Sequence, residues 1–136
     1  MSGLVGVMNR VLEMKTPTLS LLVLRVADVE ASLRFYSALG FVFVREQHGS
    51  GLLHHSCETG NVVIEIYPIK AGAVQESKAA GATMIGFTVV DLDATLNTLH
   101  DSNQRETPTP KVSDWGRWVN VSDPDGRIVQ LTEAIV

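Results

Sequence analysis

The sequence predicts an α+β fold built from two βαβββ modules, preceded by a short N-terminal helix. Three observations carry this prediction. Residues 26–33 recur in similar form as residues 89–96, so that Asp28 matches Asp91. Each copy follows an apolar run rich in β-branched residues, which is typical of a strand. Each copy also precedes three short apolar segments separated by turn residues. A repeat of this length indicates two copies of one supersecondary unit.

The composition is that of a single folded domain. The chain has 136 residues, of which 45% are hydrophobic and 19% charged, and this balance excludes a disordered chain. A net charge of −4 with scattered basic residues argues against nucleic acid or an anionic membrane surface as a partner. No segment approaches the roughly 18 consecutive apolar residues of a membrane span.

Cysteine usage indicates the compartment. Cys57 is the only cysteine, so no disulfide can form within the chain. The first residues also lack the charged region and cleavage motif of a secretory signal. We therefore expect a cytoplasmic protein in which Cys57 is a buried apolar thiol rather than a nucleophile.

The N-terminal half is expected to hold an extension and the first module. Residues 1–17 form a helical extension, because apolar residues recur at helical spacing before Thr16-Pro17. The first module spans residues 18–69. Its apolar strand over 19–26 is expected to be buried on both faces. A helix over 28–39 starts at Asp28 and stops at Gly40. The remaining strands are expected over residues 41–47, 51–58 and 61–69.

The second half repeats this plan. Residues 70–82 are the expected linker, and residues 83–136 form the second module, so that 18–136 is one compact domain. A strand over 83–90 precedes a helix over 91–102 and three shorter strands. Asp123-Pro124-Asp125-Gly126 is a strong turn signal, since proline fixes one φ and glycine accepts a left-handed conformation. Each module has an apolar sheet face that it cannot bury alone, so the modules must associate within one chain or across a dimer.

Three motifs resemble a known family. Residues 24–32, the run Phe35-Tyr36-Ser37-x-Leu39-Gly40-Phe41 and the turn at Asp123 look like the vicinal oxygen chelate superfamily. Its members include glyoxalase I, extradiol dioxygenases, fosfomycin resistance proteins and the bleomycin resistance protein. The resemblance covers about residues 18–135. It implies a cupped mixed β-sheet with helices outside and a small-molecule ligand on the concave face. Homodimers, some with swapped modules, are common in the family, and we expect a homodimer.

The resemblance also places four metal-ligand positions, on the first and last strands of each module. Here these positions hold Leu21, Glu65, Met84 and Gln130. Leucine offers no donor atom, and a thioether suits Cu(I) rather than harder ions. One carboxylate and one amide do not hold a catalytic divalent ion. We therefore expect no metal site of the usual kind and no cofactor, with a divalent metal held by other ligands left open.

Strand pairing suggests how Glu65 is used. If Thr59-Gly60 is a two-residue hairpin loop, then His54 lies opposite Glu65 and both face the cup. The pair could be a catalytic general base, two donors of an unusual metal site, polar anchors for a ligand, or simply a polar cross-strand pair. His55 should point the other way, and His48, His55 and His100 are expected to be solvated rather than functional.

Alternation along the strands gives the predicted ligand-binding residues. They share the face that looks into the cup: Leu21, Arg25, His54, Glu65, Tyr67, Met84, Thr88, Trp118 and Gln130. Trp118 could stack on a flat ligand or pack in the core. Arg25 could pair with Glu65 or hold a ligand carboxylate. We expect a structural role for Tyr36.

Two functions fit this reading. One is a small-molecule binding protein that lacks the usual metal site, like the bleomycin resistance branch. The alternative is a glyoxalase-like lyase or isomerase that acts on a small carbonyl compound, with Glu65 as base and His54 beside it. Dioxygenase chemistry is the least expected, because its two-histidine, one-carboxylate triad is not supplied by the family positions.

Overall fold

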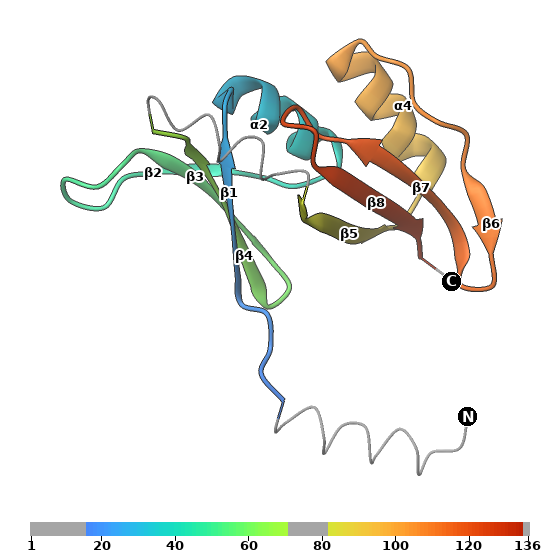
Figure 1. Ribbon diagram of the computed structural model, residues 1–136, viewed down its shortest axis with the longest axis horizontal. Helices are drawn as coiled ribbons and strands as arrows, with labels where there is room; N and C mark the ends of the chain where they lie inside the picture. Colours follow the sequence, from blue (N-terminus) through green and yellow to red (C-terminus); the bar gives the residue numbers. More distant parts are fainter. Residues whose placement is uncertain (1–15, 71–81, 135–136) are drawn as a thin grey trace.

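The structure, a computed structural model, describes residues 16–70 and 82–134. The helix predicted over the first residues and most of the predicted linker lie outside these ranges. The described part holds two helices and eight strands in the predicted order (Figure 1). The first module contains β1 (Leu21–Val26), α2 (Val29–Ala38), β2 (Val44–Glu46), β3 (His54–Thr59) and β4 (Val62–Pro68). The second contains β5 (Met84–Val89), α4 (Leu92–Asn103), β6 (Lys111–Ser113), β7 (Gly116–Ser122) and β8 (Ile128–Glu133).

Each module forms its own four-stranded mixed sheet. The strand orders are β1-β4-β3-β2 and β5-β8-β7-β6. The first strand of each module runs parallel to the last, and the other pairs are antiparallel. This arrangement confirms the α+β class and both βαβββ modules. The two sheets are separate and open, with β1 and β5 each at a sheet edge.

The repeated aspartates start both helices. Asp28 and Asp91 are N-caps in extended conformation, and each side chain accepts a hydrogen bond from a backbone N–H three residues on, at 3.0 Å. This bond satisfies one of the donors that the first helical turn leaves free. Gly40, with φ of 112°, follows α2 and confirms the predicted stop. Neither helix in the described ranges is long and apolar enough to cross a membrane.

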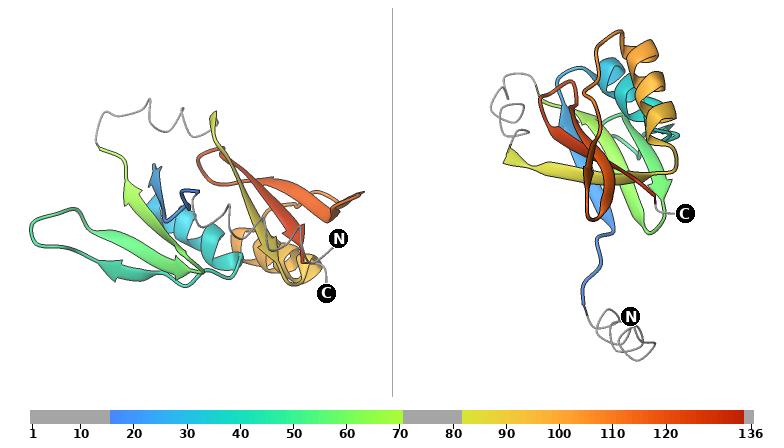
Figure 2. Two further views of the ribbon diagram at one scale, coloured as in Figure 1. Left: turned by 90° about the horizontal axis from the view of Figure 1, so that it is seen from below. Right: turned by 90° about the vertical axis from the view of Figure 1, so that its right-hand side faces the viewer.

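The two helices lie side by side and join the modules into one core (Figures 1 and 2). Each helix covers one face of its own sheet. The most deeply buried large side chains come from both modules: Phe35, Tyr36, Ile64, Ile66, Leu92, Leu99 and Leu131. Phe41 and Phe87 also make an edge-to-face contact between the modules, with ring centroids 4.8 Å apart. The described parts of both modules therefore share one hydrophobic core.

Burial along β1 differs from the prediction. Val26 and Leu24 are buried against α2, as expected. Leu21 and Val23, however, point to the other face, and Leu21 is 51% exposed. The expectation that this strand is buried on both faces is therefore wrong for the single chain. A helix covers only one side of the sheet, so side chains alternate between core and surface.

The hairpin between β3 and β4 also differs from the prediction. Thr59 pairs with Val62, so the two turn residues are Gly60 and Asn61 rather than Thr59 and Gly60. Gly60 has a φ of 57° at the first central turn position, where a type II′ hairpin turn requires glycine. Ser56, not His54, therefore lies opposite Glu65. The pairing is displaced by two residues, which leaves every side chain on its predicted face.

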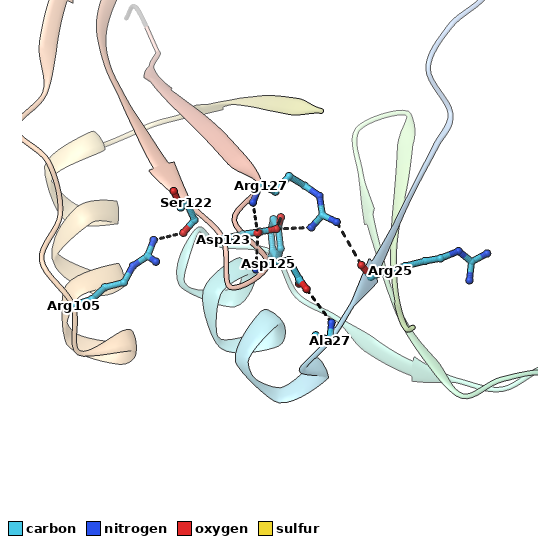
Figure 3. A network of polar contacts seen from close by, with 8 residues as sticks. Arg25, Ala27, Arg105, Ser122, Asp123, Asp125 and Arg127 are labelled. Atoms are coloured by element: carbon cyan, nitrogen blue, oxygen red, sulfur yellow. Dashed lines mark hydrogen bonds and ion pairs between the residues drawn. The ribbon is translucent and has the colours of Figure 1, made fainter. Parts of the chain in front are cut away.

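A buried ion pair fastens the turn between β7 and β8 to α2 (Figure 3). The Arg127 guanidinium donates to Oδ2 of Asp123 at 2.5 Å, and the Tyr36 hydroxyl of α2 donates to the same oxygen at 2.6 Å. The backbone N–H groups of Asp125 and Arg127 donate to its other oxygen. Burial, followed by the adjacent Asp123 charge, raises the pKa of the Tyr36 hydroxyl far above its usual range, so it stays a donor. The predicted structural role of Tyr36 agrees with this geometry.

The same turn also reaches the end of β1. Asp125 accepts a hydrogen bond from the backbone N–H of Ala27 at 3.0 Å, just before α2 begins. The Arg127 guanidinium donates to the backbone carbonyl of Arg25 at 3.5 Å (Figure 3). The predicted Asp-Pro-Asp-Gly turn is therefore present, with Gly126 at a φ of 87°, and its carboxylates hold the two modules together.

Candidate functional site

The predicted site residues lie on the sheet faces that the helices leave uncovered, and they divide between the two sheets. The first sheet carries Leu21, Arg25, His54, Glu65 and Tyr67. The second sheet carries Met84, Thr88, Trp118 and Gln130. Strand register brings members of each group together. On the first sheet, Arg25 is paired with Tyr67. On the second sheet, Thr88 and Trp118 lie on either side of Thr132 and are both paired with it.

His54 and Glu65 meet on the first sheet. Nε2 of His54 lies 3.2 Å from Oε2 of Glu65, and the histidine side chain is only 2% exposed. Nδ1 of His54 lies 3.1 Å from the backbone carbonyl of Leu52. A carbonyl oxygen can only accept, so Nδ1 carries a proton and Nε2 faces the carboxylate. The shared face of His54 and Glu65 is confirmed, although the register that predicted it is displaced by two residues.

A row of flat groups extends from this pair. Tyr67 stacks on His54, with ring centroids 4.4 Å apart and an interplanar angle of 11°. The guanidinium of Arg25 lies over the Tyr67 ring, 5.8 Å from its centroid. Arg25 therefore makes a cation–π contact, and no ion pair joins it to Glu65 among the described residues. Because β4 lies between β1 and β3, the Tyr67 ring lies between Arg25 and His54, and the Glu65 carboxylate lies beside His54.

Sequence reasoning missed two neighbours of His54. Glu46 is paired with His54 in the β2–β3 hairpin, and its Oε2 lies 3.5 Å from His54 Nε2. His48, in the loop after β2, places Nε2 3.3 Å from the same Glu46 oxygen. The strands predicted over residues 41–47 and 51–58 are shortened, and the resulting loop turns His48 back toward the sheet. Cross-strand pairing of Glu46 with His54 is the signal that could have found this cluster.

The other histidines stand apart from this group. His100 is exposed at the end of α4, as expected, with Nδ1 3.3 Å from Asp101. His55 points away from His54 but is half-buried, so the expectation that it is solvated is only partly met. Cys57 is buried and free, in agreement with its predicted role as an apolar thiol.

The second sheet presents an aromatic surface. Trp118 is half-buried on β7, and its indole N–H donates to the Ser113 hydroxyl at 2.7 Å. Trp115 stacks beside it with centroids 6.0 Å apart, and the Lys111 ammonium lies 5.3 Å from the Trp118 centroid. Trp118 is not among the buried residues of the described core. Trp118 therefore lies on the surface of the second sheet, in contact with Trp115 and Lys111.

The usual metal positions do not fit a divalent ion. Leu21 and Met84 are both about half exposed on edge strands, and neither offers a nitrogen or oxygen donor. Gln130 is paired with Gly86 on the second sheet, apart from Glu65 on the first. Of the four family positions, only Glu65 therefore offers a strong ligand, and no other family position places a ligand beside it.

A separate hollow lies between the modules. It has a volume of about 470 Å³ and lies where the end of α2 faces the end of β5 and the start of α4. Leu39, Phe41, Phe87 and Asp91 are among its lining residues, and Thr88 is the only predicted ligand residue that lines it. The histidine and carboxylate cluster is therefore not part of this hollow.

Comparisons with known proteins give a consistent picture. A family model described as "Glyoxalase/Bleomycin resistance protein/Dioxygenase superfamily" matches residues 18–131. No curated protein matches the sequence. Among solved structures, UcmS2 is 16% identical with a TM-score of 0.69, over 88% of this chain and 99% of its own.

Two further structures are similar over nearly their full lengths. TnmS3 from Streptomyces sp. CB03234, titled an antibiotic binding protein, is 21% identical with a TM-score of 0.65 and covers 88% of this chain and 98% of its own. A glyoxalase family protein from Enterococcus faecalis is 22% identical with a TM-score of 0.62 and covers 88% of this chain and 100% of its own. At these low sequence identities, the similarity shows a shared fold and nothing further.

Proposed function

Because the chain belongs to the glyoxalase/bleomycin resistance protein/dioxygenase superfamily, we propose that it binds a small organic molecule on its helix-free sheet faces, without the usual metal site of that superfamily. One observation carries this proposal. The first sheet presents Arg25, Tyr67 and His54 as one stack beside the carboxylate of Glu65, and Arg25 is the exposed end of this stack. Such a surface offers apolar contact with a few fixed polar groups, as small-molecule sites do.

The chemistry of the row favours a flat ligand. The exposed Arg25 guanidinium at the end of the stack can lie against a planar ring, and Glu65 can accept a hydrogen bond or pair with a cationic group. Trp118 and Trp115 supply matching aromatic surface on the second sheet. The antibiotic-binding description of TnmS3, said of that protein, supports an antibiotic-like natural product as the ligand class. Leu21 and Met84 at the metal positions support recognition by contact rather than by chelation.

The complete site forms between two copies of the chain in this proposal. The two groups of predicted residues lie on different sheets, and β1 and β5 are both edge strands with unpaired backbone groups on one side. Exposed apolar residues gather on these strands, namely Leu21, Val23 and Met84. Open edges with apolar side chains favour association. Pairing of β1 from one copy with β5 from another would bring the two surfaces to one ligand.

Replacing Met84 with glutamate should convert a dimer into a monomer. In the proposed interface a carboxylate on the β5 edge would lose its hydration, which is unfavourable. Burial of the exposed apolar side chain of Met84 in the same place is favourable. Light scattering coupled to size-exclusion chromatography gives the mass directly. Val112→Glu is the matched control, because Val112 is also an exposed apolar residue but lies on β6 at the opposite edge of the same sheet. A monomeric wild-type protein, or a dimeric Met84→Glu variant, would contradict the shared site.

The second candidate function is a glyoxalase-like lyase or isomerase acting on a small carbonyl compound. The observation that favours it is the 3.2 Å separation of buried His54 Nε2 and Glu65 Oε2. A carboxylate in this position could remove a proton next to a carbonyl group, and the imidazole could then hold or return that proton. Glu65 is the base in this scheme, and His54 is its partner.

Glu65→Gln separates the two functions. A panel of antibiotics and small carbonyl compounds is titrated against the protein, with the fluorescence of Trp115 and Trp118 as readout and mass spectrometry of the recovered ligand. For a binding protein, loss of a charge-assisted hydrogen bond should cost about 1.5–3 kcal/mol of affinity, and the ligand is recovered unchanged. For an enzyme, the wild type converts the compound and the variant binds it without conversion. Glu58→Gln, an exposed residue of β3, is the control and should behave as wild type.

A further inference from the structure

The β2–β3 hairpin carries a group of metal-ligand side chains that none of the usual family positions includes. Glu46 is the last residue of β2, His54 is the first of β3, and His48 lies in the loop between them. Each of the three offers one ligand atom, and these atoms lie within 4.8 Å of one another. We propose that Glu46, His48 and His54, with Glu65 beside them, bind a divalent transition-metal ion such as Zn²⁺.

The distances fit a tetrahedral ion. Four ligand atoms at about 2.0–2.2 Å from tetrahedral zinc are about 3.3–3.6 Å from one another. His48 Nε2 and Glu46 Oε2 are 3.3 Å apart, Glu46 Oε2 and His54 Nε2 are 3.5 Å apart, and His54 Nε2 and Glu65 Oε2 are 3.2 Å apart. Three of the six separations are therefore close to the edge length of such a tetrahedron. The ligand atoms of Glu46, His48 and His54 already lie within 4.8 Å of one another, and Glu65 would move toward them to complete the set.

The buried imidazole is an independent indication. Nε2 of His54 is buried and has no hydrogen-bond partner within the described ranges, although two carboxylate oxygens lie within 3.5 Å. Nδ1 already donates to the Leu52 carbonyl, so in the neutral ring Nε2 holds a lone pair. The repulsion between this lone pair and the two carboxylates is removed when Nε2 binds either a proton or a metal ion. An imidazole held through Nδ1 by a backbone carbonyl is the usual arrangement of a histidine metal ligand.

The loop that follows β2 is shaped to return His48 to the cluster. The Gly51 N–H donates to the His48 carbonyl at 2.9 Å, which closes a turn. A Cβ on residue 51 would lie 2.9 Å from that same carbonyl oxygen, so the turn requires glycine there. The His48 ring then lies near the His54 ring, with centroids 5.4 Å apart. His48 is 78% exposed, which leaves one side of the site open to solvent and to an incoming ion.

The donor set selects the class of ion. Two imidazole nitrogens with one or two carboxylates suit Zn²⁺, Ni²⁺ or Co²⁺, whereas Mg²⁺ and Ca²⁺ prefer oxygen ligands alone. The site shares only Glu65 with the family positions discussed above. It shares His54 and Glu65 with the proposed ligand surface, but metal binding is measured with no organic ligand present, so the two proposals are tested separately.

Equilibrium dialysis of the metal-free, full-length protein against Zn²⁺, with the bound metal quantified, tests this site. We expect one ion per chain. His48→Ala removes an exposed ligand and should weaken zinc binding by at least the ~10–100-fold that loss of a supporting residue costs at metal sites. Glu46→Gln keeps the side-chain shape and should weaken binding similarly. His100→Ala is the matched control, because His100 is also exposed and beside a carboxylate but has no second histidine.

Cobalt provides a readout of geometry. Co²⁺ bound at the site should show the visible absorption of a tetrahedral ion in the wild type and in His100→Ala, and this absorption should be lost in His48→Ala. Circular dichroism of each variant checks that the fold is retained. A wild-type protein that binds no zinc, or His48→Ala and Glu46→Gln variants that bind it as tightly as wild type, would overturn the proposal.

Discussion

Replacing Asp123 with alanine should lower the free energy of unfolding by about 3–5 kcal/mol, because the change leaves a buried cation without its partner. The Asp123 side chain is fully buried and that of Arg127 nearly so. The substitution also removes the acceptor of the Tyr36 hydroxyl and of two backbone N–H groups. Chemical denaturation followed by circular dichroism gives the change directly.

An exposed ion pair in the same chain provides the control. Asp93 pairs with Arg117 at 2.8 Å, and the side chains are 66% and 36% exposed, respectively. Asp93→Ala should therefore leave the stability almost unchanged, because water replaces the lost partner. If Asp123→Ala proved no more harmful than Asp93→Ala, the β7–β8 turn would not hold the two modules together as described.

Leu96→Ala should destabilise the protein by about 2–5 kcal/mol, the usual cost of truncating a buried leucine. The internal repeat supplies its own comparison, since Leu33 occupies the equivalent position of the first helix. Leu96 is 6% exposed, whereas Leu33 is only partly buried at the border of the core. Leu33→Ala should accordingly cost less, because less apolar surface is lost and solvent can fill the space.

The same denaturation measurement compares the two leucine variants. The slope of the unfolding free energy against denaturant concentration should be unchanged in both variants, which would show that only the stability has altered. Equal losses in the two variants would contradict the unequal burial of the two helices in the shared core.

The two helices and their order could be predicted because the signals are local. Asp28 and Asp91 cap the helices through a bond three residues away, and Gly40 ends the first helix by its own φ. Burial on β1 was predicted less well, because an apolar run such as residues 19–26 does not indicate which face a partner element covers. Which face is covered depends on tertiary packing, and a local sequence pattern does not contain this information.

The candidate site was predicted in part for a similar reason. The hairpin register was wrong, yet His54 and Glu65 were correctly placed on one face, since a displacement of two residues preserves alternation. Glu46 was missed because the β2–β3 register that pairs it with His54 was not considered, and His48 because its position depends on the loop after β2. Such a loop is set by turns like that at Gly51 rather than by hydrophobic periodicity.

The hydrogen bond from Ala27 to Asp125 has a consequence for how the molecule unfolds. It secures the first turn of α2 with a side chain from the far end of the sequence, and Tyr36 anchors the same helix to Asp123. Melting of one half would break these bonds and remove supports of the other. Although the duplicated sequence suggests two autonomous folding units, we therefore expect a single cooperative transition between the ordered and denatured states.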